Sequence, residues 1–199
     1  MSIVFMGVGL GILLILFAPI IFWYPMYGRD IESDALQSPI QGEIQNVENP
    51  IYVLGNNTDG EEGKTYKITI EKLGIVEAEV RVGAEDLDTS LIQFPGTALP
   101  GDMGNSVIFG HSVLPYFYNP KSYKTIFSTL HLLTQGDLIR VEYDGVQYLY
   151  RVEGKKLVSP KDYSILSQPD QERKLSLVTC VPPGIDLGRL VISAKLLGS

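Results

Sequence analysis

The only cysteine of the chain, Cys180, stands where a short strand-like segment ends. That segment is Leu175–Thr179, and a Pro-Pro-Gly turn follows the thiol almost at once. Nine residues after the thiol, Arg189 opens a second strand-like segment, Leu190–Ala194. If the two segments pair as an antiparallel hairpin, the thiol and the guanidinium lie at the same end of the sheet. A thiol at a strand end with a fixed cation nearby is a candidate for a cysteine nucleophile.

Such a nucleophile also needs a group that moves protons. A free thiol has a pKa of about 8.5, so at neutral pH it requires a base or a cationic environment. His111 follows the strand-like run Ser106–Phe109 and can supply or accept a proton near neutral pH. Arg189 stays charged and can stabilise the oxyanion of a tetrahedral intermediate. The other histidine, His131, lies within a helical pattern and is interpreted as structural.

Each of these residues also has an ordinary structural interpretation. A single cysteine often behaves as a small buried hydrophobe, an arginine most often forms a surface ion pair, and a histidine in a turn often bonds to the backbone. The predicted chemistry therefore depends on Cys180, His111 and Arg189 meeting in one cleft.

Composition and charge exclude several classes of function. One cysteine cannot form an internal disulfide, so the fold depends on its apolar core. The formal net charge is −7, and residues 28–63 account for it with eight acidic residues and one basic residue. The remaining 15 acidic and 15 basic residues balance, which argues against nucleic acid as a partner. No His-rich or Cys-rich spacing indicates a metal site, and no cofactor is expected.

The N-terminal segment is long and apolar enough to cross a membrane. Ile3–Trp23 contains no charged residue, and its 21 residues would rise about 30 Å as a helix, the thickness of a bilayer core. Trp23 and Tyr24 stand at the end of the run, where aromatic side chains prefer the interface. Residues 1–27 are therefore predicted to be an uncleaved transmembrane anchor, with a cleaved signal peptide as the alternative. The charges do not support an outward-facing domain, because the first basic residue, Arg29, follows the span.

Residues 28–63 have a different character from the segments on either side. They are acidic, rich in Asn, Gly and Pro, and lack a regular apolar spacing. This composition predicts a flexible stalk or arm between the membrane segment and a folded domain over residues 64–199.

Short runs of alternating apolar and polar residues dominate the folded domain, and this is the pattern of half-buried strands. The predicted strands are Tyr66–Ile70, Val76–Val82, Ser106–Phe109, Leu138–Tyr143, Val146–Val152, Leu175–Thr179 and Leu190–Leu196. Asp144-Gly145 between two of them predicts a hairpin turn. Ile126, Leu130 and Leu133 recur at i, i+4 and i+7 and predict a helical segment. Many short strands with one or two short helices indicate a mostly β fold, a closed or nearly closed barrel.

In this order, the residues resemble the sortases, cysteine transpeptidases of bacterial surfaces, over about residues 66–196. The segment Ile68-Thr-Ile-Glu-Lys-Leu-Gly-Ile is similar to the family's first barrel strand, and Gly-Asn-Ser-Val-Ile-Phe-Gly-His111 resembles the stretch that leads to its catalytic histidine. Leu175-Ser-Leu-Val-Thr-Cys resembles the family's Thr-Leu-x-Thr-Cys signature, and Arg189 matches its arginine. The compact connection from cysteine to arginine is most like that of the pilus-building class C. However, residues 28–63 contain no Asp-Pro-aromatic lid element, so a housekeeping-like or a minor class is equally open.

The resemblance implies a sortase-type barrel of about eight strands over residues 64–199. It implies Cys180, His111 and Arg189 as catalytic residues, and Thr179 beside the thiol as a residue that orients substrate. The implied reaction cleaves a Leu-Pro-x-Thr-Gly-like sorting signal through a thioacyl-enzyme. The acyl group then passes to an amine of a cell-wall precursor or a pilin lysine. The implied partners are surface or pilin proteins, and the implied location is the cell membrane with the domain outside the cytoplasm.

Two other functions remain open on the residues alone. The chain could be a non-catalytic, membrane-anchored barrel that binds peptide or scaffolds a pilus, with an inert Cys180. It could also be a hydrolytic cysteine peptidase that uses the same site and transfers the acyl group to water.

Overall fold

A computed structural model describes residues 62–198, which belong to the second of two compact units of the chain, residues 46–199. The predicted anchor, residues 1–27, and nearly all of the predicted arm, residues 28–63, lie outside the described residues. No helix among residues 62–198 has the length and apolar character needed to cross a membrane.

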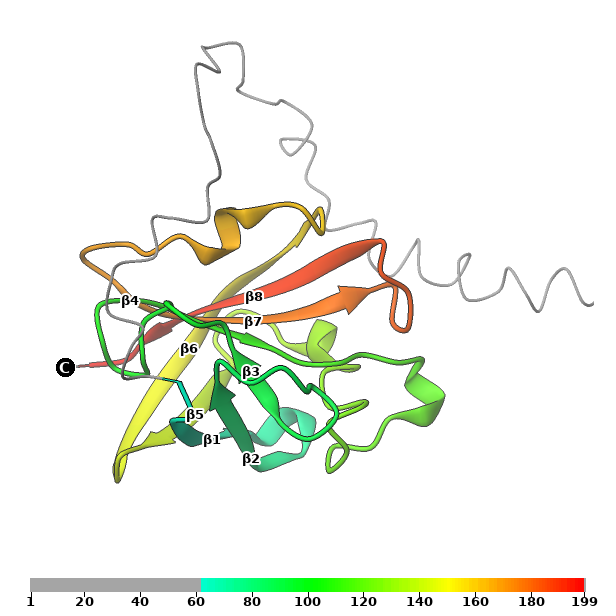
Figure 1. Ribbon diagram of the computed structural model, residues 1–199, viewed down its shortest axis with the longest axis horizontal. Helices are drawn as coiled ribbons and strands as arrows, with labels where there is room; N and C mark the ends of the chain where they lie inside the picture. The colour runs from blue at the N-terminus through cyan, green and yellow to red at the C-terminus, as the bar shows by residue number, and fades with distance from the viewer. Residues whose placement is uncertain (1–61, 199) are drawn as a thin grey trace, which may run out of the picture. The chain divides into compact units, whose positions relative to one another are not determined.

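Eight strands close into one barrel in the order β1-β2-β3-β4-β7-β8-β6-β5 (Figure 1). The β2–β3 and β4–β7 pairs are parallel, and the other neighbours are antiparallel. The strands are β1 (Thr65–Ile70), β2 (Ile75–Val82), β3 (Leu91–Gln93), β4 (Gly104–Phe109), β5 (Leu138–Tyr143), β6 (Val146–Val158), β7 (Arg173–Val181) and β8 (Gly188–Leu196). Short 3₁₀ helices are η5 (Glu71–Leu73), η6 (Pro115–Phe117), η7 (Leu130–Leu132) and η8 (Tyr163–Leu166). The predicted mostly β, closed barrel is confirmed.

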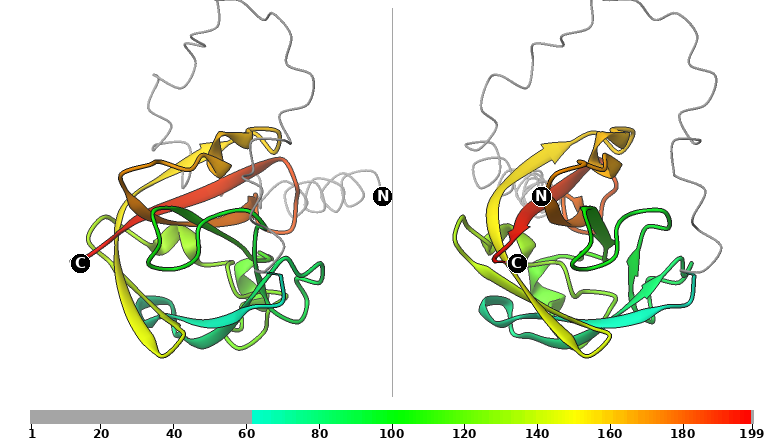
Figure 2. Two further views of the ribbon diagram at one scale, coloured as in Figure 1. Left: turned by 60° about the vertical axis from the view of Figure 1, so that its left-hand side comes forward. Right: turned by 90° about the vertical axis from the view of Figure 1, so that its left-hand side faces the viewer.

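The turn between β5 and β6 forms as predicted. Asp144 and Gly145 have φ angles of 51° and 73°, and the two positive values match the right-handed twist of the strands that they join. β6 continues six residues beyond the predicted end at Val152, with a register shift between Val152 and Gly154. This length lets β6 pair with β5 near its start and with β8 near its end (Figure 2).

The sequence pattern misplaced one side chain in β2. Strict alternation over Val76–Val82 predicts that Val76 is buried with Ala78 and Val80, but Val76 is exposed, and Ile75 is buried in its place. The cause is a β-bulge, because Ile68 pairs with Ala78 whereas Ile70 pairs with Ile75. Glu77, within the bulge, has a φ of 48°. One extra residue reverses the side on which each earlier side chain points.

The predicted helical segment is built from tighter turns than an α-helix. Ile126, Leu130 and Leu133 are all buried, as their spacing requires. However, the backbone bonds join residues three apart, including those from Leu130 N–H to Phe127 O and from Leu133 N–H to Leu130 O. The regular part is the 3₁₀ helix η7, which also places an apolar residue on the core every three or four positions.

A buried polar network ties the short strand β3 to β1 and to the loop that follows β3. The Tyr66 hydroxyl donates to Gln93 Oε1 at 2.7 Å, and Gln93 Nε2 donates to the carbonyls of Thr97 and Ala98, both at 3.0 Å. Burial raises the pKa of Tyr66 well above its ordinary value, so the hydroxyl keeps its proton. The sequence pattern did not predict β3, because its three residues are all buried and therefore show no alternation of apolar and polar side chains.

Candidate active site

Pairing of β7 with β8 brings the thiol and the guanidinium together. Cys180 is the residue directly opposite Arg189 in the antiparallel register. Side chains of directly opposed residues project to the same face of a sheet, so both groups stand on one side. The predicted hairpin over these two segments is confirmed, and its connection projects from the right-hand side of the barrel in Figure 1.

His111 reaches the same place from the other side of β7. The parallel β4–β7 register ends with Phe109 opposite Val178. The alignment continues beyond β4, since Gly110 N–H donates to Val178 O at 3.1 Å and Ser112 Oγ donates to Cys180 O at 2.7 Å. These bonds lay the backbone of residues 110–112 along the end of β7, so the segment that carries His111 neighbours Cys180 on one side while Arg189 is opposite Cys180 on the other.

Close packing under the turn explains why a glycine precedes the histidine. A Cβ atom on Gly110 would lie 2.5 Å from the Phe127 ring and 2.6 Å from Leu91. These contacts are far shorter than van der Waals separation, so a larger residue would push the chain away from the core. The turn is also tied down beyond the glycine, because Phe127 N–H donates to His111 O at 3.0 Å.

The thiol itself is half-buried and free of any disulfide. Burial raises the pKa of Cys180, while the Arg189 guanidinium lowers it and the Asp186 carboxylate raises it. Burial is the largest of the three effects, so at neutral pH the resting side chain is predominantly the protonated thiol. Reaction therefore requires that the thiolate be favoured by a neighbouring positive charge or by bound substrate.

Arg189 is mostly buried, with its side chain 20% exposed. Its guanidinium donates to the Asp186 carboxylate and, at 3.2 Å, to the Gly188 carbonyl. The bond to Asp186 raises the pKa of Arg189 and lowers that of Asp186. This carboxylate was not identified from the sequence, and its only signal is its place three residues before the arginine. Asp186 holds the guanidinium in place and competes with the thiolate for its charge.

The His111 side chain has an acidic neighbour from a distant segment. Asp88, in the connection between β2 and β3, lies 3.5 Å from His111 Nε2 and 2.9 Å from Lys124 Nζ. The hydrogen bond from Lys124 is the main cause that lowers the pKa of Asp88. Neither Asp88 nor Lys124 was singled out by the sequence, because nothing local connects them to the histidine.

Thr179 is oriented differently from the thiol next to it. Its side chain is buried, on the opposite face of β7 from Cys180, and its hydroxyl donates to Gly110 O at 2.8 Å. This geometry links β7 to the turn that carries the histidine. Contact of Thr179 with substrate stays a prediction.

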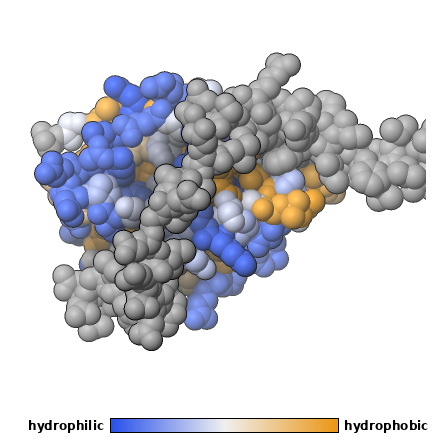
Figure 3. All heavy atoms as spheres, turned by 90° about the horizontal axis from the view of Figure 1, so that it is seen from above, coloured by the Kyte–Doolittle hydropathy of each residue, from blue (hydrophilic) through white to orange (hydrophobic). Residues whose placement is uncertain are grey.

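Two connections at this end of the barrel carry exposed apolar side chains. They are the connection after β4 and the β7–β8 connection, which are joined by a bond from Gly184 N–H to Ser112 O of 3.1 Å. The exposed residues are Leu114, Tyr116, Phe117, Ile185 and Leu187. Figure 3 shows apolar residues gathered on the right-hand side of the described domain, the side to which the β7–β8 connection projects in Figure 1.

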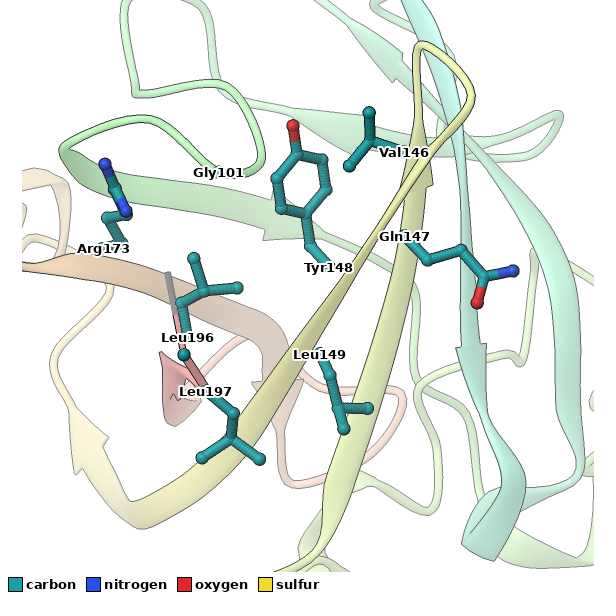
Figure 4. A pocket seen from close by; sticks show the side chains of 9 residues that line it. Gly101, Val146, Gln147, Tyr148, Leu149, Arg173, Leu196 and Leu197 are labelled. Atoms are coloured by element: carbon teal, nitrogen blue, oxygen red, sulfur yellow. The ribbon is translucent and has the colours of Figure 1, made fainter.

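A separate cavity of about 380 Å³ lies at the other end of β7 and β8, lined by residues that include Tyr148, Arg173 and Leu196 (Figure 4). Arg173 is seven residues from Cys180 along β7, which corresponds to roughly 23 Å. The cavity is therefore not part of the thiol site. Among residues 62–198, no group of three or more His, Cys, Asp or Glu side chains is placed to hold a metal ion.

The closed barrel places the half-buried Cys180 thiol directly opposite Arg189 and beside the chain segment that carries His111, the residue types that cysteine-dependent acyl transfer uses. A model of the sortase domain matches residues 68–197 of this chain. The chain therefore belongs to the sortase family and is a cysteine transpeptidase. A comparison with curated proteins finds no match.

Solved structures of sortases share the fold. A sortase D5 transpeptidase of Clostridium perfringens is 28% identical, with a TM-score of 0.58, over 68% of this chain and 79% of that one. Sortase A of Corynebacterium diphtheriae is 25% identical, with a TM-score of 0.60, over 70% of this chain and 63% of that one. Sortase C-1 of Actinomyces oris is also 25% identical, with a TM-score of 0.59, over 67% of this chain and 73% of that one. Sortases named D5, A and C-1 are thus similar to this chain to nearly the same degree.

Proposed function

We propose that this transpeptidase cleaves a Leu-Pro-x-Thr-Gly-like sorting signal and joins the new carboxyl end to an amine. The observation that carries the proposal is the alignment across β4, β7 and β8, which sets the thiol of Cys180 between Arg189 and the His111 segment. The exposed apolar residues beside the site, such as Phe117 and Leu187, supply a surface suited to the Leu and Pro side chains of the signal.

In the first half-reaction, the Cys180 thiolate attacks the carbonyl carbon of the Thr–Gly peptide bond. A carbon–sulfur bond forms, and the oxyanion is stabilised by the Arg189 guanidinium. The carbon–nitrogen bond then breaks, and protonated His111 gives its proton to the departing amine. The product is a thioacyl-enzyme that ends in the threonine of the substrate.

In the second half-reaction, an amine attacks the thioester carbonyl. His111, now neutral, accepts a proton from the amine as the new carbon–nitrogen bond forms, and the thiolate leaves. The ion pair of thiolate and imidazolium is restored. Because the acyl group is held on sulfur as a thioester, an amine acceptor can react with it, and transfer then competes with hydrolysis.

The proposed setting is the outer face of a cell membrane. Residues 1–27 would serve as a single-pass anchor, and the acidic residues 28–63 would serve as a stalk that lets the domain reach its partners. The acceptor would be a cell-wall precursor or a pilin lysine, so the enzyme would attach surface proteins to the wall or join pilin subunits.

The test uses the full-length protein with a set of peptides that contain variants of the sorting signal. Each peptide is incubated with triglycine, a lysine-containing peptide or no amine, and products are identified by mass spectrometry. We expect a ligated product that retains the threonine, and a thioacyl adduct of 1:1 stoichiometry on Cys180. Hydrolysis alone in the presence of every amine would favour the peptidase alternative.

The two histidines provide a matched control for the acid–base assignment. His111→Ala is expected to lower turnover at least 100-fold, the lower range of general acid–base contributions. His131→Asn, in η7, is expected to leave turnover within about twofold, as for a residue away from the chemistry. Near-normal rates in the His111 variant would remove this residue from the mechanism.

A further inference from the structure

Asp88 is the acidic residue that the fold places beside the proposed acid–base group. One of its oxygens lies 3.5 Å from His111 Nε2, and the other lies 2.9 Å from Lys124 Nζ. The three side chains come from the β2–β3 connection and from two positions in the β4–β5 connection. They meet next to the end of β7 that carries Cys180, although Asp88 and Cys180 are far apart in sequence.

Hydrogen bonds between side chains and the backbone close the turn that carries Asp88, and a backbone bond ties down the segment of His111. Asp88 N–H donates to Asp86 Oδ1 at 2.9 Å, and the Thr89 hydroxyl donates to Asp86 O at 3.1 Å. A turn stabilised by an aspartate side chain in this way has little freedom. On the other side, His111 O accepts the bond from Phe127 N–H. The carboxylate and the imidazole are thus presented to each other by fixed chain segments.

We propose that Asp88 is a positioning residue for His111. Its carboxylate attracts the Nε2 proton, which leaves Nδ1 to exchange a proton with the substrate amine, and it stabilises the imidazolium form. Asp88 itself neither touches substrate nor becomes protonated during the cycle. The inference rests on the acid–base role proposed for His111.

The charges near His111 determine how strongly Asp88 can stabilise the imidazolium. Asp88 is the carboxylate at ion-pair distance, while Lys124 competes for it and is itself attracted by Asp86. Across β7, the Arg189 charge is engaged by Asp186. Because burial makes the Cys180 thiolate scarce, stabilising the imidazolium enlarges the fraction of enzyme that holds thiolate and imidazolium together.

The decisive variants remove the two charges that act on His111 in opposite directions. For Asp88→Asn we expect kcat/KM to fall about threefold and the acidic limb of its pH profile to move about half a unit to lower pH, the size of one exposed ion pair. For Lys124→Met we expect the limb to move to higher pH, because Asp88 loses its competing cation. Asp86→Asn removes a carboxylate from the same loop but keeps the turn acceptor, and we expect a clearly smaller displacement, because Asp86 acts on His111 only indirectly through Lys124.

A second readout does not depend on turnover. In a Cys180→Ala background, the NMR titration of the His111 ring is expected to move in the same two opposite directions in the Asp88 and Lys124 variants. If Asp88→Asn destabilises the fold, Lys124→Met decides the question in both readouts. A purely structural Asp88 would alter the unfolding temperature without these displacements.

Failure of this inference is separable from failure of the proposed function. If His111→Ala abolishes turnover but the Asp88 and Asp86 variants give identical profiles, the histidine is catalytic and Asp88 does not position it. If His111→Ala stays active, the acid–base assignment itself is wrong.

Discussion

Two pairs of polar groups join strands of this barrel: Tyr66 and Gln93 in its interior, on β1 and β3 with β2 between them, and Cys180 and Arg189 at one end, on the paired strands β7 and β8. In the interior, the Tyr66 hydroxyl is bonded to Gln93, and the Gln93 amide nitrogen is bonded in turn to backbone carbonyls. At the end of the barrel, the thiol is half-buried and the guanidinium shares its charge between Asp186 and the thiol. Complete pairing away from water gives stability, whereas incomplete pairing at the surface leaves a group able to react.

This contrast predicts that variants of Cys180 and Arg189 change the turnover rate without changing the free energy of unfolding. Variants of Tyr66 and Gln93 are expected to change the free energy of unfolding without changing the turnover rate. The two kinds of residue lie in one barrel, so the same purified protein serves both measurements. Three experiments address the contrast, in decreasing order of expected effect.

Cys180→Ala is expected to abolish transpeptidation, with a loss of at least about 1,000-fold in kcat, because no other nucleophile is available in the proposed mechanism. The free energy of unfolding should change by less than about 1 kcal/mol, since the thiol is only half-buried. Rates come from the ligation assay and stability from urea denaturation. Measurable ligation by this variant would show that Cys180 is not the nucleophile and would contradict the proposed difference between the interior pair and the thiol site.

Gln93→Leu is expected to lower the free energy of unfolding by about 1–3 kcal/mol, because the Tyr66 hydroxyl loses its acceptor in a buried site. Adding Tyr66→Phe should recover part of the loss, since the unpaired hydroxyl is then removed as well. Urea denaturation of the two variants gives both numbers. Turnover per folded molecule should stay unchanged, and a selective fall in kcat would show that the interior network also serves the chemistry.

The smallest effect concerns the charges at the thiol. Arg189 lowers and Asp186 raises the pKa of Cys180, so Arg189→Met should move the pH midpoint of thiol alkylation upward and Asp186→Asn should move it downward. We expect displacements below about one unit, because one unit corresponds to 1.36 kcal/mol and both partners are partly exposed to water. Iodoacetamide labelling followed by mass spectrometry measures the midpoint. Displacements of the same sign in both variants would contradict the opposing roles.

Much of the barrel was predictable because side-chain alternation is a local property. Seven of its strands and the Asp144-Gly145 turn follow from short runs of sequence, although the bulge at Glu77 reversed the side of Val76. β3 could not be recognised, because its three buried residues carry no alternation. The 3₁₀ character of η7 was missed for a related reason, since periods of three and of 3.6 residues bury the same few positions over a short segment.

The candidate site divides in the same way. Cys180 and Arg189 are joined by a short connection, so a hairpin brings them together and their spacing alone predicts it. Asp186 lies within that connection, but the sequence does not show whether its side chain turns toward the arginine. Asp88 and Lys124 gave no signal, because their contacts with each other and with His111 join separate connections of the chain.

From its residues alone, this chain specified a barrel of short strands with a thiol and a guanidinium at one hairpin end. Barrel closure then selected β4 as the second neighbour of β7, which set the segment of His111 along the end of β7, and the β2–β3 connection set Asp88 beside the imidazole. The reason is that alternation and hairpin turns act between residues close in sequence. Pairing of distant strands is instead selected by how the whole set of strands buries its apolar faces and satisfies its backbone bonds.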